Sequence, residues 1–215
     1  MNMWVFRVPN AFGGEPDGKC PITLNINALK TGLTTGTVSH LTYDGSIGIN
    51  FILEELFLHH RLRQGWGIPT LDLRLSDNAW IENFIIASNR YWGDVSDCAK
   101  ASGRLKILSR MVQMKINDII FLPNVKDKVV DHDYFTVVTV KNPYYFEDRS
   151  QAPNTWEKDF AHVIEVDKDK IKTYPFSGKT LPKSIFGAPF MHAIDQIGPS
   201  YKTYNTFDQF VKDSY

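Results

Sequence analysis

The sequence has 215 residues, 43% of them apolar, and its 24 basic and 24 acidic side chains give a formal net charge of zero. A strongly basic nucleic-acid coat is therefore excluded, although a local basic patch is not. No apolar run is long enough to span a bilayer, so we expect one globular domain, soluble and cytoplasmic, with no membrane partner.

The two cysteines and the start of the chain bear on the compartment. Cys20 and Cys98 lie far apart and form no metal-type pair. Their number and spacing predict free thiols in a reducing cytosol rather than a disulfide scaffold. The opening MNMWVFRVPN lacks the basic-then-apolar layout of a signal peptide, which agrees with a cytoplasmic protein.

The first third of the chain predicts one strand and one helix. Residues 3–8, MWVFRV, alternate in character and predict an opening strand. A glycine-rich loop follows at residues 10–20, and residues 22–43 have only weak periodicity. Apolar residues then recur at helical spacing over residues 48–62, which predicts an amphipathic helix that leads into RQGWG, residues 63–67.

The rest of the chain changes from helical to strand periodicity. Two helices are expected at residues 77–91, with Asp77 as the cap, and at residues 103–114, and an amphipathic helix is expected at residues 205–215. Four short β-branched and aromatic runs predict strands at residues 119–123, ended by Pro123, and at residues 135–140, 162–166 and 171–176. Because open sheet edges are a hazard, we predict an α+β fold with a small bent β-barrel and several surrounding helices.

Known catalytic patterns are mostly missing. A common divalent-metal nuclease needs an acid followed by an acid-x-lysine pair on a strand, but in HVIEVDKDKIK neither Asp167 nor Asp169 has a lysine two residues on. His59 and His60 are adjacent and would point to different sides of a helix, which does not suit zinc. The sequence contains no nucleophile elbow and no phosphate-binding glycine loop. We therefore predict a protein that is not an enzyme and holds no metal or cofactor.

The segment RLRQGWG fits a binding role better. Arginine offers a planar fork of donors to guanine or phosphate, glutamine can read a base edge, and an indole is a flat stacking surface. Gly65 and Gly67 on either side of Trp66 would let the backbone approach a ligand closely. The same residues equally fit a tight turn whose indole plugs one end of the barrel.

The order of the later segments carries a resemblance. RQGWG is followed by a helix ending in Met114, by INDIIFLP with Asp118, Ile120 and Phe121, then by YFTVVTVKNPYYFE and DFAHVIEV. In this order the chain resembles the PUA-like superfamily in its EVE and YTH-related branches, which have a small bent β-barrel. The resemblance covers a core of about residues 60–195 within a single domain, 1–215, with an N-terminal extension at 1–59 and the C-terminal helix at 205–215.

The resemblance implies a nucleic-acid-binding module that flips a modified base, a modified cytosine or adenine in DNA, into an aromatic pocket. Such modules often serve as the specificity part of restriction and antiviral defence systems, so a nuclease or NTPase partner is also implied. The implied pocket walls are Trp66, Trp92 and the cluster Tyr144, Tyr145 and Phe146; the implied base-edge contacts are Gln64, Asp159 and His162; the implied phosphate contacts are Arg61, Arg63 and Lys141. The chain departs from the better-known readers because it lacks their longer Trp-Asn-rich signature.

Other interpretations stay open. A reader of modified or single-stranded RNA would use the same barrel without opening a duplex. An enzyme could use a cleft between the barrel and the helices at 48–62 and 77–91. The zero net charge favours a protein-interaction domain, whereas a crowding of basic residues argues for nucleic acid; these are Arg61, Arg63 and Arg74, and on one helix Lys100, Arg104, Lys106, Arg110 and Lys115. The singled-out residues also have structural interpretations: Met114 and Phe121 as core, Asp118 and Asp159 as turn or cap residues, His162 as a strand-edge histidine, and Tyr145 and Phe146 as cross-strand packing.

Overall fold

The computed structural model describes residues 1–8, 45–66, 71–88, 98–153, 157, 159–187, 190 and 192–215. The helices are α2 Gly45–His59, α3 Asp77–Ala87, α4 Cys98–Leu108, α5 Arg110–Gln113 and α6 Tyr204–Ser214, with short 3₁₀ turns at Lys168–Lys170 and Lys183–Phe186. The strands are β1 Met3–Phe6, β2 Arg61–Gln64, β3 Ile119–Lys126, β4 Val129–Phe146, β5 His162–Val166, β6 Lys172–Pro175 and β7 Ile194–Ile197. The predicted loop at 10–20 and the stretch at 22–43 lie outside these residues.

One sheet organises the described part of the chain. Its strands follow the order β2-β5-β4-β3-β1-β7, and β6 pairs with β4 off this path. β4 is long: its first part pairs with β3 on one edge and β6 on the other, and its second part pairs with β5. Register shifts between Val140 and Tyr145 mark where β4 bends towards β5. The prediction of an α+β fold with a strongly bent sheet is confirmed.

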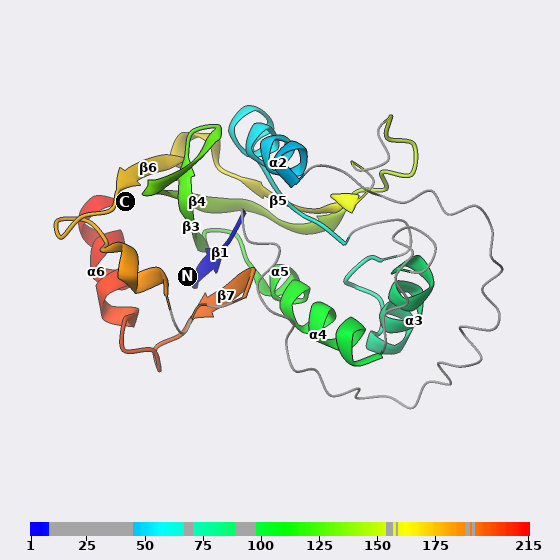
Figure 1. Cartoon of the computed structure of the whole chain (residues 1–215). Helices are drawn as coiled ribbons and strands as arrows, with labels where there is room; N and C mark the ends of the chain where they lie inside the picture. The colour runs from blue at the N-terminus through cyan, green and yellow to red at the C-terminus, as the bar shows by residue number, and fades with distance from the viewer. Residues whose placement is uncertain are drawn as a thin grey trace.

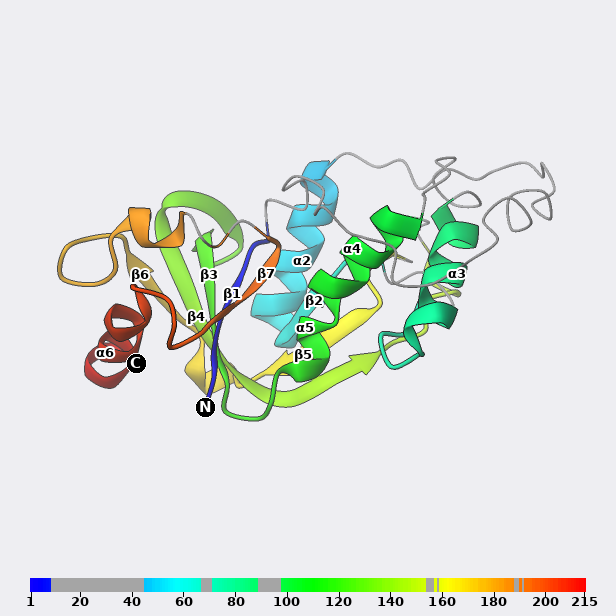
Figure 2. The ribbon, with the colours of Figure 1, turned by 90° about the horizontal axis from the view of Figure 1, so that it is seen from below.

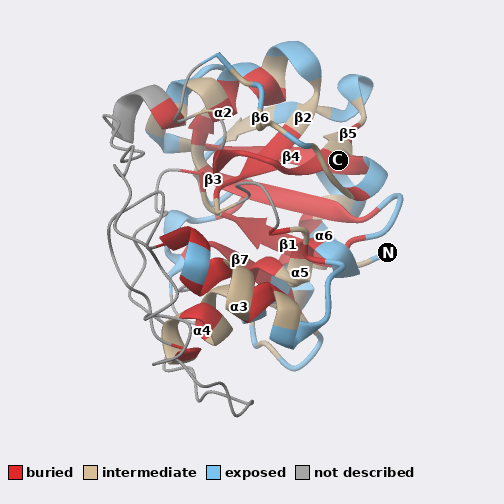
Figure 3. Ribbon diagram, turned by 90° about the vertical axis from the view of Figure 1, so that its right-hand side faces the viewer, coloured by how far each residue is buried: buried red, intermediate tan, exposed pale blue. Residues whose placement is uncertain are grey.

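The two faces of the sheet pack against different helices. In β1, Trp4 and Phe6 point into a large core together with residues of α2, α3 and α4, whereas Met3 and Val5 point into a second core with α6. Figure 1 and Figure 2 show α6 on the opposite side of the strands from α3 and α4. Buried strands lie between helices whose outer surfaces are exposed (Figure 3). The period-2 alternation of β1 therefore sorts its side chains between two cores.

The first strand is an internal strand of the sheet, between β3 and β7. β1 runs parallel to β3 and antiparallel to β7. The carboxylate of Asp118, which is 1% exposed, accepts hydrogen bonds from the backbone N–H of Asn2 at 2.6 Å and from the indole Nε1 of Trp4 at 3.0 Å. β1 is thus paired on both sides, and Asp118 is a buried acceptor that fastens Asn2 and Trp4.

Several predicted boundaries move. The helix expected to reach residue 62 ends at His59, because His60 takes a left-handed conformation with φ 58° and the chain then enters β2. Ser76, rather than Asp77, caps α3: its side chain accepts from the backbone N–H of Ala79. Pro123 lies inside β3, at a register shift, instead of ending it. The strands β2 and β7 were not predicted.

Cys98, the first residue of α4, is disulfide-bonded. The prediction of a free thiol is therefore wrong for Cys98, and a disulfide does not support the reducing compartment that the cysteine spacing suggested. Cys20 lies outside the described residues. In the part of the chain that the structure describes, no helix has the length and apolar character needed to cross a bilayer.

Candidate functional site

The site forms where β2 ends and meets the start of β5. The two strands run antiparallel with Gln64 opposite His162, so Gly65 and Trp66 leave the sheet beside the residues that enter β5. Trp66 has a left-handed backbone, φ 59°, and its indole is partly buried against the large core. A bulky residue in this conformation is a genuine outlier, so the surroundings must stabilise it. We call Gly65, Trp66, Asp159 and His162 the Trp66 corner.

Asp159 and His162 hold the backbone of Trp66 from two sides. The Asp159 carboxylate accepts the Trp66 N–H at 2.7 Å, and Nε2 of His162 lies 3.1 Å from the Trp66 carbonyl oxygen. Both side chains are buried, with 6% of Asp159 and none of His162 exposed. Because a carbonyl only accepts, His162 must carry a proton on Nε2. The left-handed residue is thus fixed by two buried side chains.

Burial changes the titration of both residues. Desolvation raises the pKa of Asp159 to about 7. The hydrogen bond from the Trp66 N–H favours the carboxylate and acts in the opposite direction, but it is the smaller of the two effects. Desolvation also lowers the pKa of His162 to about 4, opposed by the hydrogen bond to Trp66 and by the charge of Asp72. His162 is therefore neutral at physiological pH, whereas Asp159 titrates close to it.

A hydrogen-bonded chain continues behind His162. Nδ1 of His162 lies 3.0 Å from the hydroxyl of Tyr144, which also accepts the Leu73 N–H at 3.1 Å and lies 3.2 Å from Oδ1 of Asp72. With its proton on Nε2, neutral His162 presents Nδ1 as an acceptor, so the single hydroxyl proton of Tyr144 has two acceptors within reach, Nδ1 of His162 and Oδ1 of Asp72. Burial raises the pKa of Tyr144, which keeps that proton in place. The ring orientation of His162 is fixed at both nitrogens.

Gly65 allows the close approach of Asp159. A Cβ atom built at Gly65 would lie 2.9 Å from Oδ2 of Asp159, inside the range that real Cβ contacts avoid. A glycine next to Trp66 was predicted to permit close approach, and here the group that approaches is a carboxylate of the protein itself. Gly67 lies outside the described residues.

The indole of Trp66 meets a cation from α4. The guanidinium carbon of Arg104 lies 4.2 Å from the centroid of the ring. This is the geometry of a cation–π pair, which is attractive by about 0.5–2 kcal/mol depending on exposure. Arg104 appeared in the sequence only as one of several basic residues on a helix, so its place at the corner was not predicted.

The predicted pocket residues separate into two groups. Phe146 packs edge-on against the ring of His162, with centroids 5.8 Å apart, and Gln64 is buried opposite His162 in the sheet. Tyr145 lies elsewhere: the charges that act on its hydroxyl come from Glu165, Glu147 and the arginines of β2. Trp92 lies outside the described residues. Trp66, Gln64, Phe146, Asp159 and His162 are therefore brought together, and Tyr145 is not.

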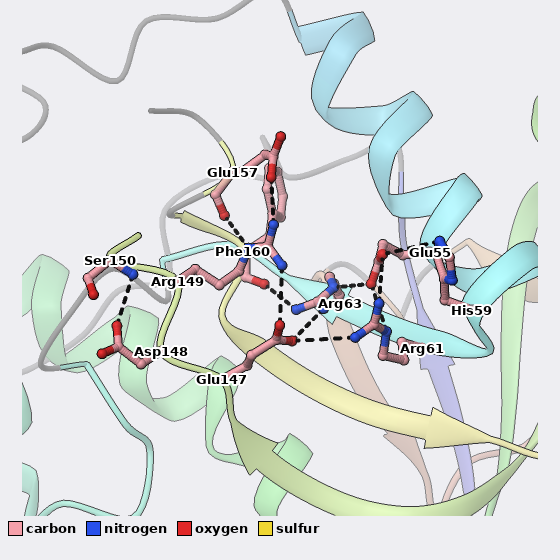
Figure 4. Close-up of polar contacts among 10 residues, drawn as sticks. All are labelled: Glu55, His59, Arg61, Arg63, Glu147, Asp148, Arg149, Ser150, Glu157 and Phe160. Carbon is pink, nitrogen blue, oxygen red and sulfur yellow. Dashed lines mark hydrogen bonds and ion pairs between the residues drawn. The ribbon is translucent and has the colours of Figure 1, made fainter. Parts of the chain in front are cut away.

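The predicted phosphate contacts have other roles or positions. Arg63 is fully buried, and its guanidinium donates to Glu55 at 2.5 Å, to Glu147 at 2.5 Å and to the carbonyl oxygen of Phe160 at 2.9 Å (Figure 4). Arg61 lies beside it and bonds Glu55 at 3.0 Å. A phosphate cannot reach a fully buried guanidinium, so the phosphate role predicted for Arg63 is corrected to a structural one.

These ion pairs extend into one network. Arg149 bonds the carboxylate of Glu157 at 2.6 Å and that of Glu147 at 3.4 Å (Figure 4). We call Glu55, Arg61, Arg63, Glu147, Arg149 and Glu157 the Arg63 network. It ties α2, β2, the end of β4 and the turn before Asp159 together. Lys141, the third predicted phosphate contact, is exposed on β4 near Val166, at the far end of β5 from His162.

The arrangement is suited to holding an aromatic ring in place. At the Trp66 corner, Asp159 accepts the N–H of Trp66 and His162 donates to the carbonyl oxygen of Trp66. Both side chains therefore bond the backbone of Trp66. Within the described residues, no group of three or more His, Cys, Asp or Glu side chains could hold a metal ion. No family model, curated protein or solved structure matches the chain.

Proposed function

We propose that this protein is a nucleic-acid-binding module that accepts a modified, flipped base, a cytosine or adenine of DNA, against the indole of Trp66. In this proposal it has a PUA-like barrel and acts in the cytoplasm as the specificity part of a restriction or antiviral defence system, together with a nuclease or NTPase partner. Binding, rather than catalysis, is its activity.

One observation supports the proposal above the others. Trp66 is held in an unfavourable left-handed conformation by two buried side chains. Asp159 bonds its backbone N–H, and His162 bonds its carbonyl oxygen. A left-handed bulky residue costs about 1–3 kcal/mol, and such strain persists where the exact direction of a side chain matters. None of the buried core residues in the described part of the chain has a positive φ apart from glycine, so filling space does not by itself require this backbone.

The physical chemistry of base recognition suits this arrangement. A methyl group adds only a small apolar increment, so selectivity for a modified base requires a rigid surface packed closely around it. Stacking on an aromatic side chain contributes about 1–3 kcal/mol per base. Asp159 and His162 face the backbone of Trp66, so in the proposed site they position the indole, and contacts to the base edge come from other groups.

The test is competition binding at one fixed, moderate salt concentration, because phosphate contacts alone change affinity strongly with salt. The probes are short duplexes that differ in one base, with cytosine, methylcytosine, hydroxymethylcytosine or methyladenine, and a single-stranded RNA. We expect one modified duplex to bind about tenfold or more tightly than the unmodified one, which corresponds to ~1.4 kcal/mol. Preference for the RNA would assign the site to the RNA-reader alternative.

The variant that tests the site is Trp66→Ala, which keeps a side chain at the left-handed position and so adds little new backbone strain. It should abolish the preference for the modified base while unfolding stays cooperative. Tyr145→Ala, which removes a half-exposed aromatic residue away from the corner, is the matched control and should keep the preference. If the protein without substitutions binds all probes equally, a protein-interaction domain is the better interpretation.

A further inference from the structure

We infer that His192, Asp195 and Arg110 form a second binding site, which takes a phosphate group with three non-bridging oxygens, as in a phosphate monoester. We call these three residues the His192 site. The inference is independent of the proposed function, because Asp195 belongs to β7, and β7 lies at the opposite end of the strand order from β2. The helix α5, which begins with Arg110, packs beside β7 (Figure 1).

Asp195 fixes the orientation of the His192 ring. Its carboxylate is buried and accepts hydrogen bonds from the backbone N–H of His192 at 2.9 Å and from Nδ1 of the ring at 2.9 Å. Because a carboxylate only accepts, Nδ1 carries a proton. Among the described residues none bonds the other ring nitrogen, Nε2, and the His192 side chain is 37% exposed. A carboxylate that holds one imidazole nitrogen in this way directs the other nitrogen at a partner from solution.

Arg110 presents one edge of its guanidinium group beside that ring. Its Nη1 donates to Oδ1 of Asp195 at 2.5 Å, the oxygen that His192 also bonds, and to the carbonyl oxygen of Ile194. Both bonds use Nη1, so within the described residues Nε and Nη2 have no protein partner, and the side chain reaches the solvent. Nε and Nη2 lie on one edge of the guanidinium and form a fork that matches two phosphate oxygens.

The charges around the His192 site favour an anion. Burial lowers the pKa of Arg7, the residue directly after β1, and the nearby charge of Asp195 opposes this effect. Contacts among the described residues thus bring two guanidinium groups, those of Arg7 and Arg110, to the carboxylate of Asp195. The excess of positive charge is available to a ligand from solution.

A phosphate monoester fits these groups better than a carboxylate does. Two of its three non-bridging oxygens can meet the fork of Arg110, and the third can meet Nε2 of His192. Nε2 accepts a hydrogen bond from a P–OH group when the ring is neutral and donates one to a charged oxygen when the ring is protonated. A carboxylate has two oxygens, and the fork of Arg110 alone would occupy both.

The experiment titrates inorganic phosphate into the full chain at fixed pH and ionic strength and follows the histidine ring signals by NMR. We expect a saturable shift of the His192 signals and none for His132, an exposed histidine of β4. Methyl phosphate, a monoester, should act like inorganic phosphate. Dimethyl phosphate, a diester with two non-bridging oxygens, should bind several-fold more weakly, and acetate should cause no saturable shift.

The variants His192→Gln and Arg110→Gln should each weaken phosphate binding about tenfold, roughly the effect of one charge-assisted hydrogen bond. His132→Gln is the matched control and should leave the affinity unchanged. Thermal unfolding checks that each variant is folded, and the shift of the His192 signals in the protein without substitutions needs no variant. The inference is overturned if those signals do not move, if acetate or the diester binds as well as the monoester, or if folded His192→Gln keeps its affinity.

Discussion

The Arg63 network and the Trp66 corner meet at the end of β2, where Arg63 and Trp66 are three residues apart, and buried charge is compensated in one region and not in the other. Arg63 is surrounded by two carboxylates and a carbonyl oxygen, so its charge is fully compensated. Asp159 is also buried, yet the donor that the structure shows for it is one backbone N–H. The first arrangement fixes the fold, whereas the second keeps a group that is costly to ionise beside a half-buried indole.

The two regions are also mechanically connected. Arg63 donates to the carbonyl oxygen of Phe160, the residue directly after Asp159. Arg149 and Glu147 hold the segment that leads to the same turn. The rigid network therefore supports the turn on which Asp159 is carried. Proteins commonly place a strained binding residue on a scaffold that is itself well paired.

The largest effect is expected from a substitution that breaks the Arg63 network. Arg63→Met should lower the free energy of unfolding by about 3–5 kcal/mol, because removal of one partner leaves buried carboxylates and a buried carbonyl without their donor. Chemical denaturation measures it. Arg74→Gln is the control: Arg74 forms an ion pair with Asp72 but its side chain is 57% exposed, so its loss should cost about 1 kcal/mol or less. Equal, small effects of the two substitutions would mean that the network is dispensable.

The second prediction concerns how the corner responds to pH. The pKa of Asp159 is raised from 3.8 to about 7 in the folded protein, so its contribution to stability is lost as pH rises through that interval. The pKa of His162 is lowered from 6.5 to about 4, so its contribution is lost as pH falls from 6.5 to 4. Between about pH 4 and 6.5 the two slopes have opposite signs and cancel.

Asp159→Asn removes one of these slopes and keeps the shape of the side chain. From pH 4.5 to pH 6.5 the stability of the variant should rise, relative to the unmodified protein, by about 3 kcal/mol, since each pKa unit corresponds to ~1.4 kcal/mol. Denaturant unfolding of both proteins at the two pH values measures the difference. Parallel pH curves would show that Asp159 is ionised or solvated throughout, and that the corner holds no costly charge.

The helices and strands that could be predicted from the sequence are those that depend on a local pattern of residues. The alternation in β1 and the helical spacing in α3 and α6 are properties of a few consecutive residues, and these elements were predicted. β2 and β7 have four residues each, RLRQ and IDQI, and become strands only through pairing with distant partners. No local periodicity distinguishes such segments from loops.

Part of the membership of the candidate site could be predicted, but not the roles of its residues. Trp66, Asp159 and His162 were grouped from the order of motifs, and the structure places them together. That Asp159 and His162 would face the backbone of Trp66 depends on a left-handed tryptophan, and a tryptophan, unlike glycine, asparagine or aspartate, does not signal that conformation in a sequence. Arg63 was expected to contact a phosphate, and its burial depends on Glu55 of the preceding helix and on Glu147, which is 84 residues further along the chain.

The smallest predicted effect tests how tightly the corner is packed. Gly65→Ala places a methyl group 2.9 Å from Oδ2 of Asp159, and a short, buried carboxylate that bonds the Trp66 N–H has little room to turn away. We expect a loss of about 1–3 kcal/mol, the usual range for overpacking. Gly178→Ala is the matched control, since a Cβ there meets nothing within 4 Å and should leave stability unchanged or slightly raised.

A double-mutant cycle separates this contact from a general effect of the substitution. The backbone of Gly65 is not in the left-handed region, so alanine is compatible with it and the expected cost comes from the carboxylate alone. In an Asp159→Ala background the Gly65→Ala substitution should therefore cost much less, with a coupling of about 1–2 kcal/mol between the two sites. If the two losses simply add, Asp159 already turns freely at the corner, and the indole of Trp66 is not rigidly held.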